Sequence, residues 1–304
     1  MTVGASHALS LISTILCEPG DIVLVDVPTY HFALRILGDR GVRIVAAPTD
    51  SEGIDPEALD AMLASLLAQG RRVPMLYIVP TFCNPTGLSL PAQRRQDLVG
   101  LARRTGITIV EDDTYRELAY EGRAPDSLWR LAKGTPVVRI GSFSKTVAPG
   151  LRLGWINAEG GIVRRLMDLG YVDSGGGVNH ATGLAMAMFG LSGAYRQHVR
   201  AMRQAYKLRA ATLTAALQAS LPAAKVVPPA GGWFLWQALP SGVTASALLP
   251  AAERYGVSFV AGTEFYPDGM GGDGHIRLSF SLLSPRQLSE AVERLAHAVA
   301  ACAD

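Results

Sequence analysis

The sequence of 304 residues has little of what marks secreted and membrane proteins. It contains three cysteines, Cys17, Cys83 and Cys302, which are odd in number and far apart. This usage excludes a disulfide framework and is typical of a reduced protein, so we expect a cytoplasmic location. No apolar run approaches the thickness of a bilayer, and the N-terminus lacks a signal-peptide pattern. We therefore expect no membrane partner.

The chain also lacks an excess of charge of either sign. It has 28 basic and 26 acidic residues, and its formal net charge is +2. Such a balance provides no basic surface and predicts no nucleic-acid partner. Lysine itself is rare: Lys133, Lys145, Lys207 and Lys225 stand among basic residues that are otherwise arginine. A lysine retained in so arginine-rich a chain is a better candidate for chemistry than lysines usually are.

Hydrophobic residues are plentiful, at 49% of the chain, which indicates a globular protein with a large core. Through the first two-thirds, apolar β-rich runs alternate with amphipathic helical segments. The predicted strands cover residues 21–26, 43–47, 75–79, 107–111 and 137–140, and the predicted helices cover Ala5–Leu16 and residues 30–40, 56–69 and 91–104. The alternation predicts an α/β fold with a mostly parallel, doubly wound sheet.

The pattern changes after about residue 190. A long helix is expected over Ala194–Ser220, followed by short strands at residues 232–237, 258–261 and 275–281. The last helix begins with a capping box that has proline at its first helical position, SPRQ at residues 284–287, and runs to about residue 301. We therefore expect a large domain over residues 1–193. A long connecting helix and a smaller C-terminal α+β domain would occupy residues 194–304.

Unusual polar side chains follow three consecutive predicted strands. Asn84 comes shortly after the third strand, Asp112 and Tyr115 directly after the fourth, and Lys145 after the fifth. Ligands of open α/β sheets bind beyond the carboxyl ends of the strands. The sequence therefore predicts an amide, a carboxylate with a phenol, and an amine around one crevice.

The motifs that follow one another along the chain are GASH at residues 4–7, NPTG at 84–87, Asp112 with Tyr115, Ser142-x-x-Lys145, and Arg152. In this order they resemble the fold-type-I enzymes that depend on pyridoxal 5′-phosphate (PLP). Within that group the sequence is similar to the class I and II aminotransferases, nearest the branch of 2-aminoadipate aminotransferases and MocR-type regulator effector domains. The resemblance implies an enzyme that moves an amino group between an amino acid and a 2-oxo acid.

The resemblance also implies how the cofactor ring would be held. Lys145 would form a Schiff base with PLP, and Asp112 would keep the pyridine nitrogen protonated so that the ring accepts electrons. The neighbouring Asp113 is a rival carboxylate, but the spacing to Tyr115 favours Asp112. Tyr115 and Asn84 would hydrogen-bond the phenolate oxygen of the ring. An aromatic side chain, Tyr30, would stack on the pyridine face.

The remaining roles concern the two anionic groups, the cofactor phosphate and the substrate carboxylate. The phosphate would lie at a helix N-terminus, against Ala5, Ser6 and His7. Ser142 and Arg152 would complete this phosphate site, because arginine can grip phosphate oxygens with two hydrogen bonds. In the second domain, Arg277 matches the arginine that binds the substrate α-carboxylate, alongside Asn84. No histidine shows metal-ligand spacing, so no metal is predicted.

Other functions compete with aminotransfer. A serine acyl enzyme with an S-x-x-K motif also needs S-D-N and K-T-G elements, and the sequence contains neither. A β-lyase or decarboxylase of the same fold uses the same core residues and stays open. A non-catalytic PLP-binding regulator domain is the other alternative. The near-neutral charge and the lack of a helix-turn-helix segment in the sequence argue against it.

The start of the sequence departs from the family pattern. In the family, an N-terminal arm precedes the phosphate-binding glycine segment and helps to close the active site, whereas here that segment begins at Gly4. We therefore expect a chain without the arm, either from a truncated reading frame or because the arm was shed. The resemblance further implies a homodimer with its active sites at the interface.

Overall fold

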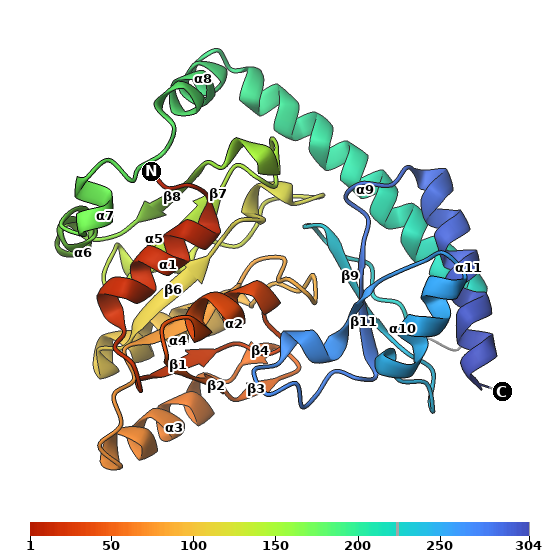
Figure 1. Cartoon of the computed structure of the whole chain (residues 1–304), viewed down its shortest axis with the longest axis horizontal. Helices are drawn as coiled ribbons and strands as arrows, with labels where there is room; N and C mark the ends of the chain where they lie inside the picture. The colour runs from red at the N-terminus through yellow and green to blue at the C-terminus, as the bar shows by residue number, and fades with distance from the viewer. Residues whose placement is uncertain (223–224, 304) are drawn as a thin grey trace.

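A six-stranded sheet forms the first part of the computed structural model, which describes residues 1–222 and 225–303 (Figure 1). Its strands are β1 (Ile22–Val25), β2 (Arg43–Ala46), β5 (Met75–Ile78), β6 (Thr108–Asp112), β7 (Val137–Ser142) and β8 (Gly154–Asn157). They lie in the order β2-β1-β5-β6-β7-β8, and all neighbours are parallel except β7 and β8. The predicted α/β fold with a mostly parallel sheet is confirmed.

Helices cover both faces of this sheet. On one face lie α1 (Ala5–Leu16), α2 (His31–Gly38) and α6 (Gly160–Met167), and on the other lie α3 (Pro56–Ala68), α4 (Ala92–Thr105) and α5 (Leu128–Ala132). Alternate residues of each strand point into opposite cores: in β1, Ile22 and Leu24 join one cluster while Val23 and Val25 join the other. Each such side chain contributes about 1.5–3 kcal/mol by burial, which explains why these strands are apolar throughout.

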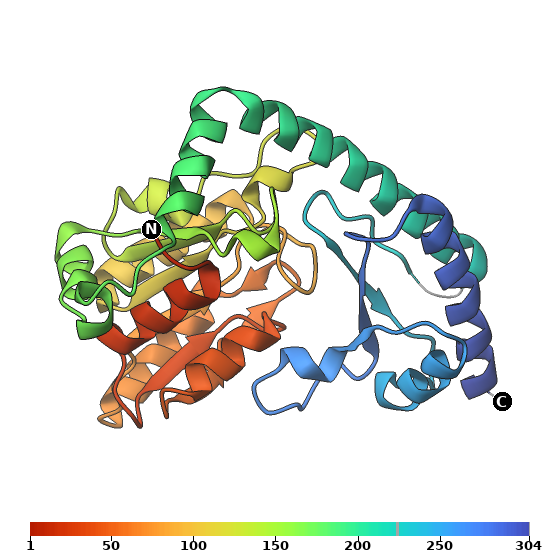
Figure 2. The same cartoon turned by 45° about the horizontal axis from the view of Figure 1, so that its top comes forward.

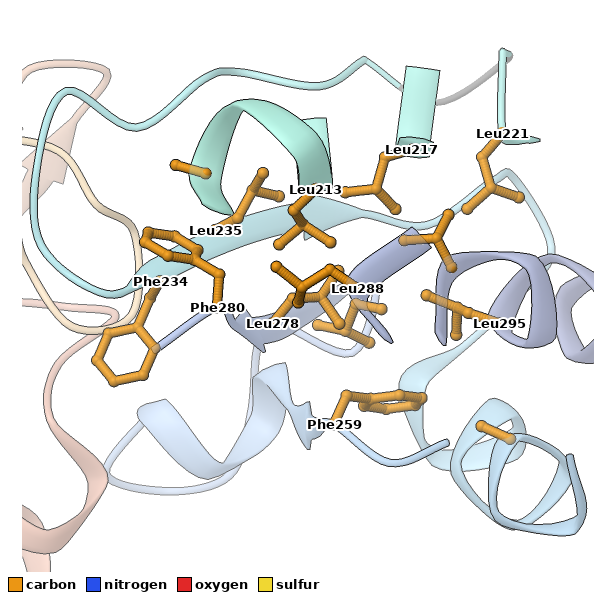
Figure 3. Packing of buried hydrophobic residues seen from close by; sticks show 14 of the residues in the cluster. Leu213, Leu217, Leu221, Phe234, Leu235, Phe259, Leu278, Phe280, Leu288 and Leu295 are labelled. Atoms are coloured by element: carbon orange, nitrogen blue, oxygen red, sulfur yellow. The ribbon is translucent and has the colours of Figure 1, made fainter. Parts of the chain in front are cut away.

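The second part of the chain builds a smaller sheet. Strands β9 (Phe234–Ala238), β10 (Val260–Ala261) and β11 (His275–Ser279) are antiparallel in the order β10-β11-β9. The 27-residue helix α9 (Ala194–Ser220) runs from the first sheet to the second, as Figure 2 shows. With α10 (Ala245–Arg254) and α11 (Pro285–Ala303) it encloses a separate core, in which leucines of α9, β11 and α11 gather (Figure 3).

Two predicted helix starts form as expected. Asp55 caps α3 by accepting hydrogen bonds from the N–H groups of Glu57 and Ala58. Ser284 and Gln287 exchange hydrogen bonds at the start of α11, as a capping box does.

Several elements were not predicted. They are β8, α5, α6, α7 (Gly170–Asp173), α8 (His180–Leu191), α10, the hairpin of β3 (Thr49–Asp50) and β4 (Gly53–Ile54), and the short helices η1 (Arg116–Leu118), η2 (Pro149–Leu151) and η3 (Gly262–Phe265). Among the described residues, none of the helices has the length and apolar character needed to cross a membrane.

Candidate active site

A cavity lies at the carboxyl ends of β5, β6 and β7. It is lined by Ala5, Ser6, Tyr30, Val79, Asn84, Asp112, Thr114, Tyr115, Ser142, Ser144, Lys145, Pro149 and Arg152. Every site residue predicted from the sequence is in this lining except His7 and Arg277. Val79, Thr114, Ser144 and Pro149 also line the cavity but were not predicted, although their places beside the predicted residues could have suggested them.

Lys145 is largely buried among aromatic rings. Its Nζ atom lies 4.7 Å from the ring centroid of Trp233 and 5.6 Å from that of Tyr115. Burial lowers the pKa of Lys145, the charges of Arg277 and Arg152 lower it further, and the charge of Asp112 acts in the opposite direction. A lowered pKa increases the fraction of free amine, which is the nucleophilic form.

Asp112 ends β6 with a side chain that is almost wholly buried. Its carboxylate accepts a hydrogen bond from the Tyr77 hydroxyl at 2.8 Å and one from the Thr114 N–H at 3.4 Å. Burial raises the pKa of Asp112, and within the described residues this carboxylate forms no ion pair. A buried carboxylate that forms no ion pair is unfavourable, so the site suits a ligand that carries a proton or positive charge.

The rival carboxylate, Asp113, belongs to a different environment. It forms ion pairs with Arg139, at 2.7 Å, and with Arg116. These arginines lie outside the cavity lining, and Asp113 is outside it too. Asp113 is therefore neutralised within the protein itself, whereas Asp112 is not.

Arg277 reaches the rim of the cavity from the second sheet. Its Nη1 atom donates a hydrogen bond to Asn84 Oδ1 at 2.9 Å, and its guanidinium lies 4.2 Å from the ring centroid of Phe234 and 5.1 Å from that of Phe265. The Nε atom is buried without a hydrogen-bond partner among the described residues. Burial lowers the pKa of Arg277, as expected for a cation that still lacks an anionic partner.

The N-terminus of α1 forms the other end of the cavity. Gly4 precedes the helix with φ 91°, and no side chain caps the helix start. A Cβ atom on Gly4 would lie 2.8 Å from Arg152 Nη2, so only glycine allows the backbone to approach this guanidinium so closely. Arg152 Nη2 donates to the Val3 carbonyl at 2.9 Å. Free N–H groups beside an arginine provide an anion site.

His7 does not contribute its side chain to this lining. Its Nδ1 atom accepts a hydrogen bond from the Val3 N–H at 3.0 Å, and its ring packs edge-on against Tyr171 at 5.8 Å. The predicted contact of His7 with a phosphate therefore finds no support in the side-chain position, while Ala5 and Ser6 do line the cavity.

The fold and this set of side chains define a transferase of amino groups. The chain belongs to the family of class I and II aminotransferases, whose model matches residues 1–295. This confirms the predicted family and the predicted enzyme class.

Individual relatives agree with the predicted branch. The 2-aminoadipate transaminase of Thermus thermophilus is 33% identical over 98% of this chain and 74% of its own length. The uncharacterized HTH-type transcriptional regulator YjiR of Escherichia coli is 34% identical over 98% of this chain and 62% of its own length. Among solved structures, Pyrococcus horikoshii kynurenine aminotransferase in complex with PMP superposes with a TM-score of 0.92 at 33% identity. That match covers 99% of this chain and 74% of the other.

Proposed function

We propose that this aminotransferase uses PLP, held by Lys145, to move an amino group from an amino acid to a 2-oxo acid. The observation that carries the proposal is the convergence of Lys145, Asp112 and Asn84 from three strand ends on one cavity. The uncompensated Asp112 carboxylate and the anion site at Gly4 fit the ring nitrogen and the phosphate of PLP. Class I and II aminotransferases generally depend on this cofactor.

PLP supplies an aldehyde that captures the amino group and a ring that withdraws electrons from the reacting carbon. Lys145 would hold the cofactor through its amine and, once free of it, would move the proton of the substrate α-carbon. Arg277 binds the carboxylate that amino acids and 2-oxo acids share, so one arginine serves both half-reactions.

The other side chains keep the ring and phosphate in place. Asp112 would hold the proton on the ring nitrogen, while Tyr115 and Asn84 would hydrogen-bond the ring oxygen. Tyr30 would pack against the ring. The backbone N–H groups of Ala5, Ser6 and His7 in the first turn of α1 would bind the phosphate together with Ser142 and Arg152.

An absorbance spectrum of the purified protein tests the proposal most directly. PLP bound to Lys145 gives a visible band, and an amino-acid donor is expected to bleach it until a 2-oxo acid restores it. Release of ammonia or carbon dioxide without restoration would instead support the lyase or decarboxylase alternative. A protein that binds no PLP at all would contradict the proposal.

The role of Arg277 leads to a separate prediction. Replacing it with glutamine (Arg277→Gln) is expected to raise KM for amino acids by about 10–100-fold, because a hydrogen bond to a charged group is worth about 1.5–3 kcal/mol. Steady-state kinetics checks this, with the exposed Arg286→Gln as the matched control. An equal loss with an amine that lacks a carboxylate would show that Arg277 does not bind this group.

We also propose that the large domain ends where α9 begins. The predicted cytoplasmic location stays a prediction.

We further propose that the chain forms a homodimer. Consecutive helices α6, α7 and α8 expose large apolar side chains, namely Val163, Met167, Tyr171, Leu184, Met188 and Leu191. Exposed apolar patches of this kind are typical of protein interfaces. Because Tyr171 contacts His7 at the start of α1, an interface here would adjoin the active site.

A charge within this apolar surface is expected to prevent dimerisation. The variant Met188→Glu should elute as a monomer in size-exclusion chromatography with light scattering, whereas the wild type should elute as a dimer. Leu282→Glu provides the control, since Leu282 is 84% exposed outside this surface. A wild-type monomer would contradict the proposed dimer, and a dimeric Met188→Glu variant would place the interface elsewhere.

A further inference from the structure

One buried hydroxyl lies in the centre of the large sheet. Tyr77 belongs to β5, which pairs with β1 on one side and β6 on the other. Its side chain is fully buried among the aliphatic residues that pack beneath α1 and α2. Burying a tyrosine hydroxyl in such surroundings is unfavourable unless it has a hydrogen-bond partner. The identity of that partner therefore indicates the role of the hydroxyl.

The register of the sheet directs this hydroxyl to Asp112. Tyr77 pairs with Val110 of β6, and Asp112 lies two residues further along the same strand, on the same face. The Tyr77 side chain reaches diagonally toward the carboxyl end of β6. Its hydroxyl lies 2.8 Å from Asp112 Oδ2. The contact between Tyr77 and Asp112 therefore follows from the pairing register of β5 and β6 and involves no loop residue.

This hydrogen bond is the shorter of the two that Asp112 accepts, since the Thr114 N–H lies 3.4 Å away. Burial, and then the charge of Asp112, raise the pKa of Tyr77 well above its ordinary value, so the phenol keeps its proton and remains a donor. Several titratable groups shift the pKa of Asp112 or have their own pKa shifted by its charge. They come from several elements and are Asp26, Tyr30, Tyr77, Cys83, Asp113, Tyr115 and Lys145.

We propose that Tyr77 is a positioning residue for aminotransfer, because it orients the Asp112 carboxylate toward the cavity and keeps it ionised. The inference rests on the proposed role of Asp112 toward the ring nitrogen. Burial acts against the charged carboxylate, and the hydrogen bond from Tyr77 acts for it. Outer hydrogen-bond partners of this kind fix the groups that contact a cofactor directly.

The variant Tyr77→Phe keeps the ring and removes only the donor. Its expected effect on Asp112 is a higher pKa, measured in the cofactor-free protein by ¹³C NMR of labelled aspartate carboxyls, with Asp112→Asn identifying the signal. In the loaded enzyme, kcat is expected to fall by about 10–100-fold with little change in KM. The acid limb of the pH profile of kcat should move to higher pH, because Asp112 then accepts a proton more readily.

A second variant tests the opposite direction and keeps both the aromatic ring and the hydroxyl. Tyr77→3-fluorotyrosine carries a more acidic hydroxyl, which donates more strongly, so the pKa of Asp112 is expected to fall. Met75→Leu alters the same face of β5 without touching a polar group and serves as the control, with an unmoved Asp112 titration. A packing role alone would make Tyr77→Phe and Met75→Leu behave alike.

Failure of this inference can be told from failure of the proposed function. An unmoved Asp112 titration in Tyr77→Phe, with kcat within twofold of the wild type, overturns the role of Tyr77 while the enzyme remains active. A wild type that binds no PLP overturns the proposed function, and the shift of the Asp112 titration in the cofactor-free protein still decides whether Tyr77 controls this carboxylate.

Discussion

Lys145→Ala is expected to abolish the visible absorbance of bound PLP and to reduce turnover by about 10⁴-fold or more. Both losses would have one cause, because the same amine is proposed to hold the cofactor and to move the proton of the substrate α-carbon. The charged groups that shift the pKa of this amine are Asp112, Arg277 and Arg152, and none of them can form the bond to an aldehyde. Spectra and single-turnover kinetics measure the two effects separately.

The matched control is Lys207→Ala. Lys207 is half-exposed on α9 and pairs with Glu121, so its loss should leave both spectrum and turnover unchanged. Since burial lowers the pKa of Lys145, its amine in the cofactor-free protein should lose its proton at a lower pH than the amine of an exposed lysine does. A Lys145→Ala variant that kept both absorbance and turnover would refute the assignment of this lysine.

Asp112→Asn is expected to lower kcat by about 10²–10⁴-fold, since removing one partner of a buried charge pair costs about 3–5 kcal/mol. Without the cofactor, the same change should stabilise the protein. Burial raises the pKa of Asp112 in the folded state, so stability is lost as the pH rises from the unfolded-state value through the folded-state value. At neutral pH the melting temperature of cofactor-free Asp112→Asn should therefore exceed that of the wild type by about 2–4 °C.

The substitution Asp113→Asn at the neighbouring carboxylate is expected to change stability in the opposite direction. It removes the ion pairs with Arg116 and Arg139, so the variant should lose stability at neutral pH whether or not PLP is present. Calorimetry with and without cofactor distinguishes the two aspartates. If cofactor-free Asp112→Asn proved less stable than the wild type at neutral pH, a cation within the protein would already neutralise the carboxylate, and its proposed role would be wrong.

Much of the fold and most of the cavity lining could be predicted, because both depend on local patterns. Strands buried on two faces are apolar at every position, and the residues just beyond them fall at one edge of the sheet. The long helix that was predicted at about residues 194–220 is α9, whose 27 residues run from Ala194 to Ser220.

Non-local features could not be predicted in this way. Strand β8 has only four residues, GWIN, and forms because it pairs with β7 in the antiparallel direction. Helix α10 contains Pro250, which ordinarily marks a helix end. Tyr77 resembles any aromatic core residue until the register of β5 and β6 brings it to Asp112.

The position of Arg277 has a consequence for how this enzyme can diversify. All residues of the cavity lining belong to the segment from Ala5 to Arg152, whereas the proposed carboxylate-binding arginine comes from β11, and 193 positions separate it from its partner Asn84. The proposed cofactor-binding residues and the proposed carboxylate-binding arginine thus belong to separate stretches of sequence. On these proposed roles, substitutions in the second sheet would change how the substrate carboxylate is bound while the cofactor-binding residues stay as they are.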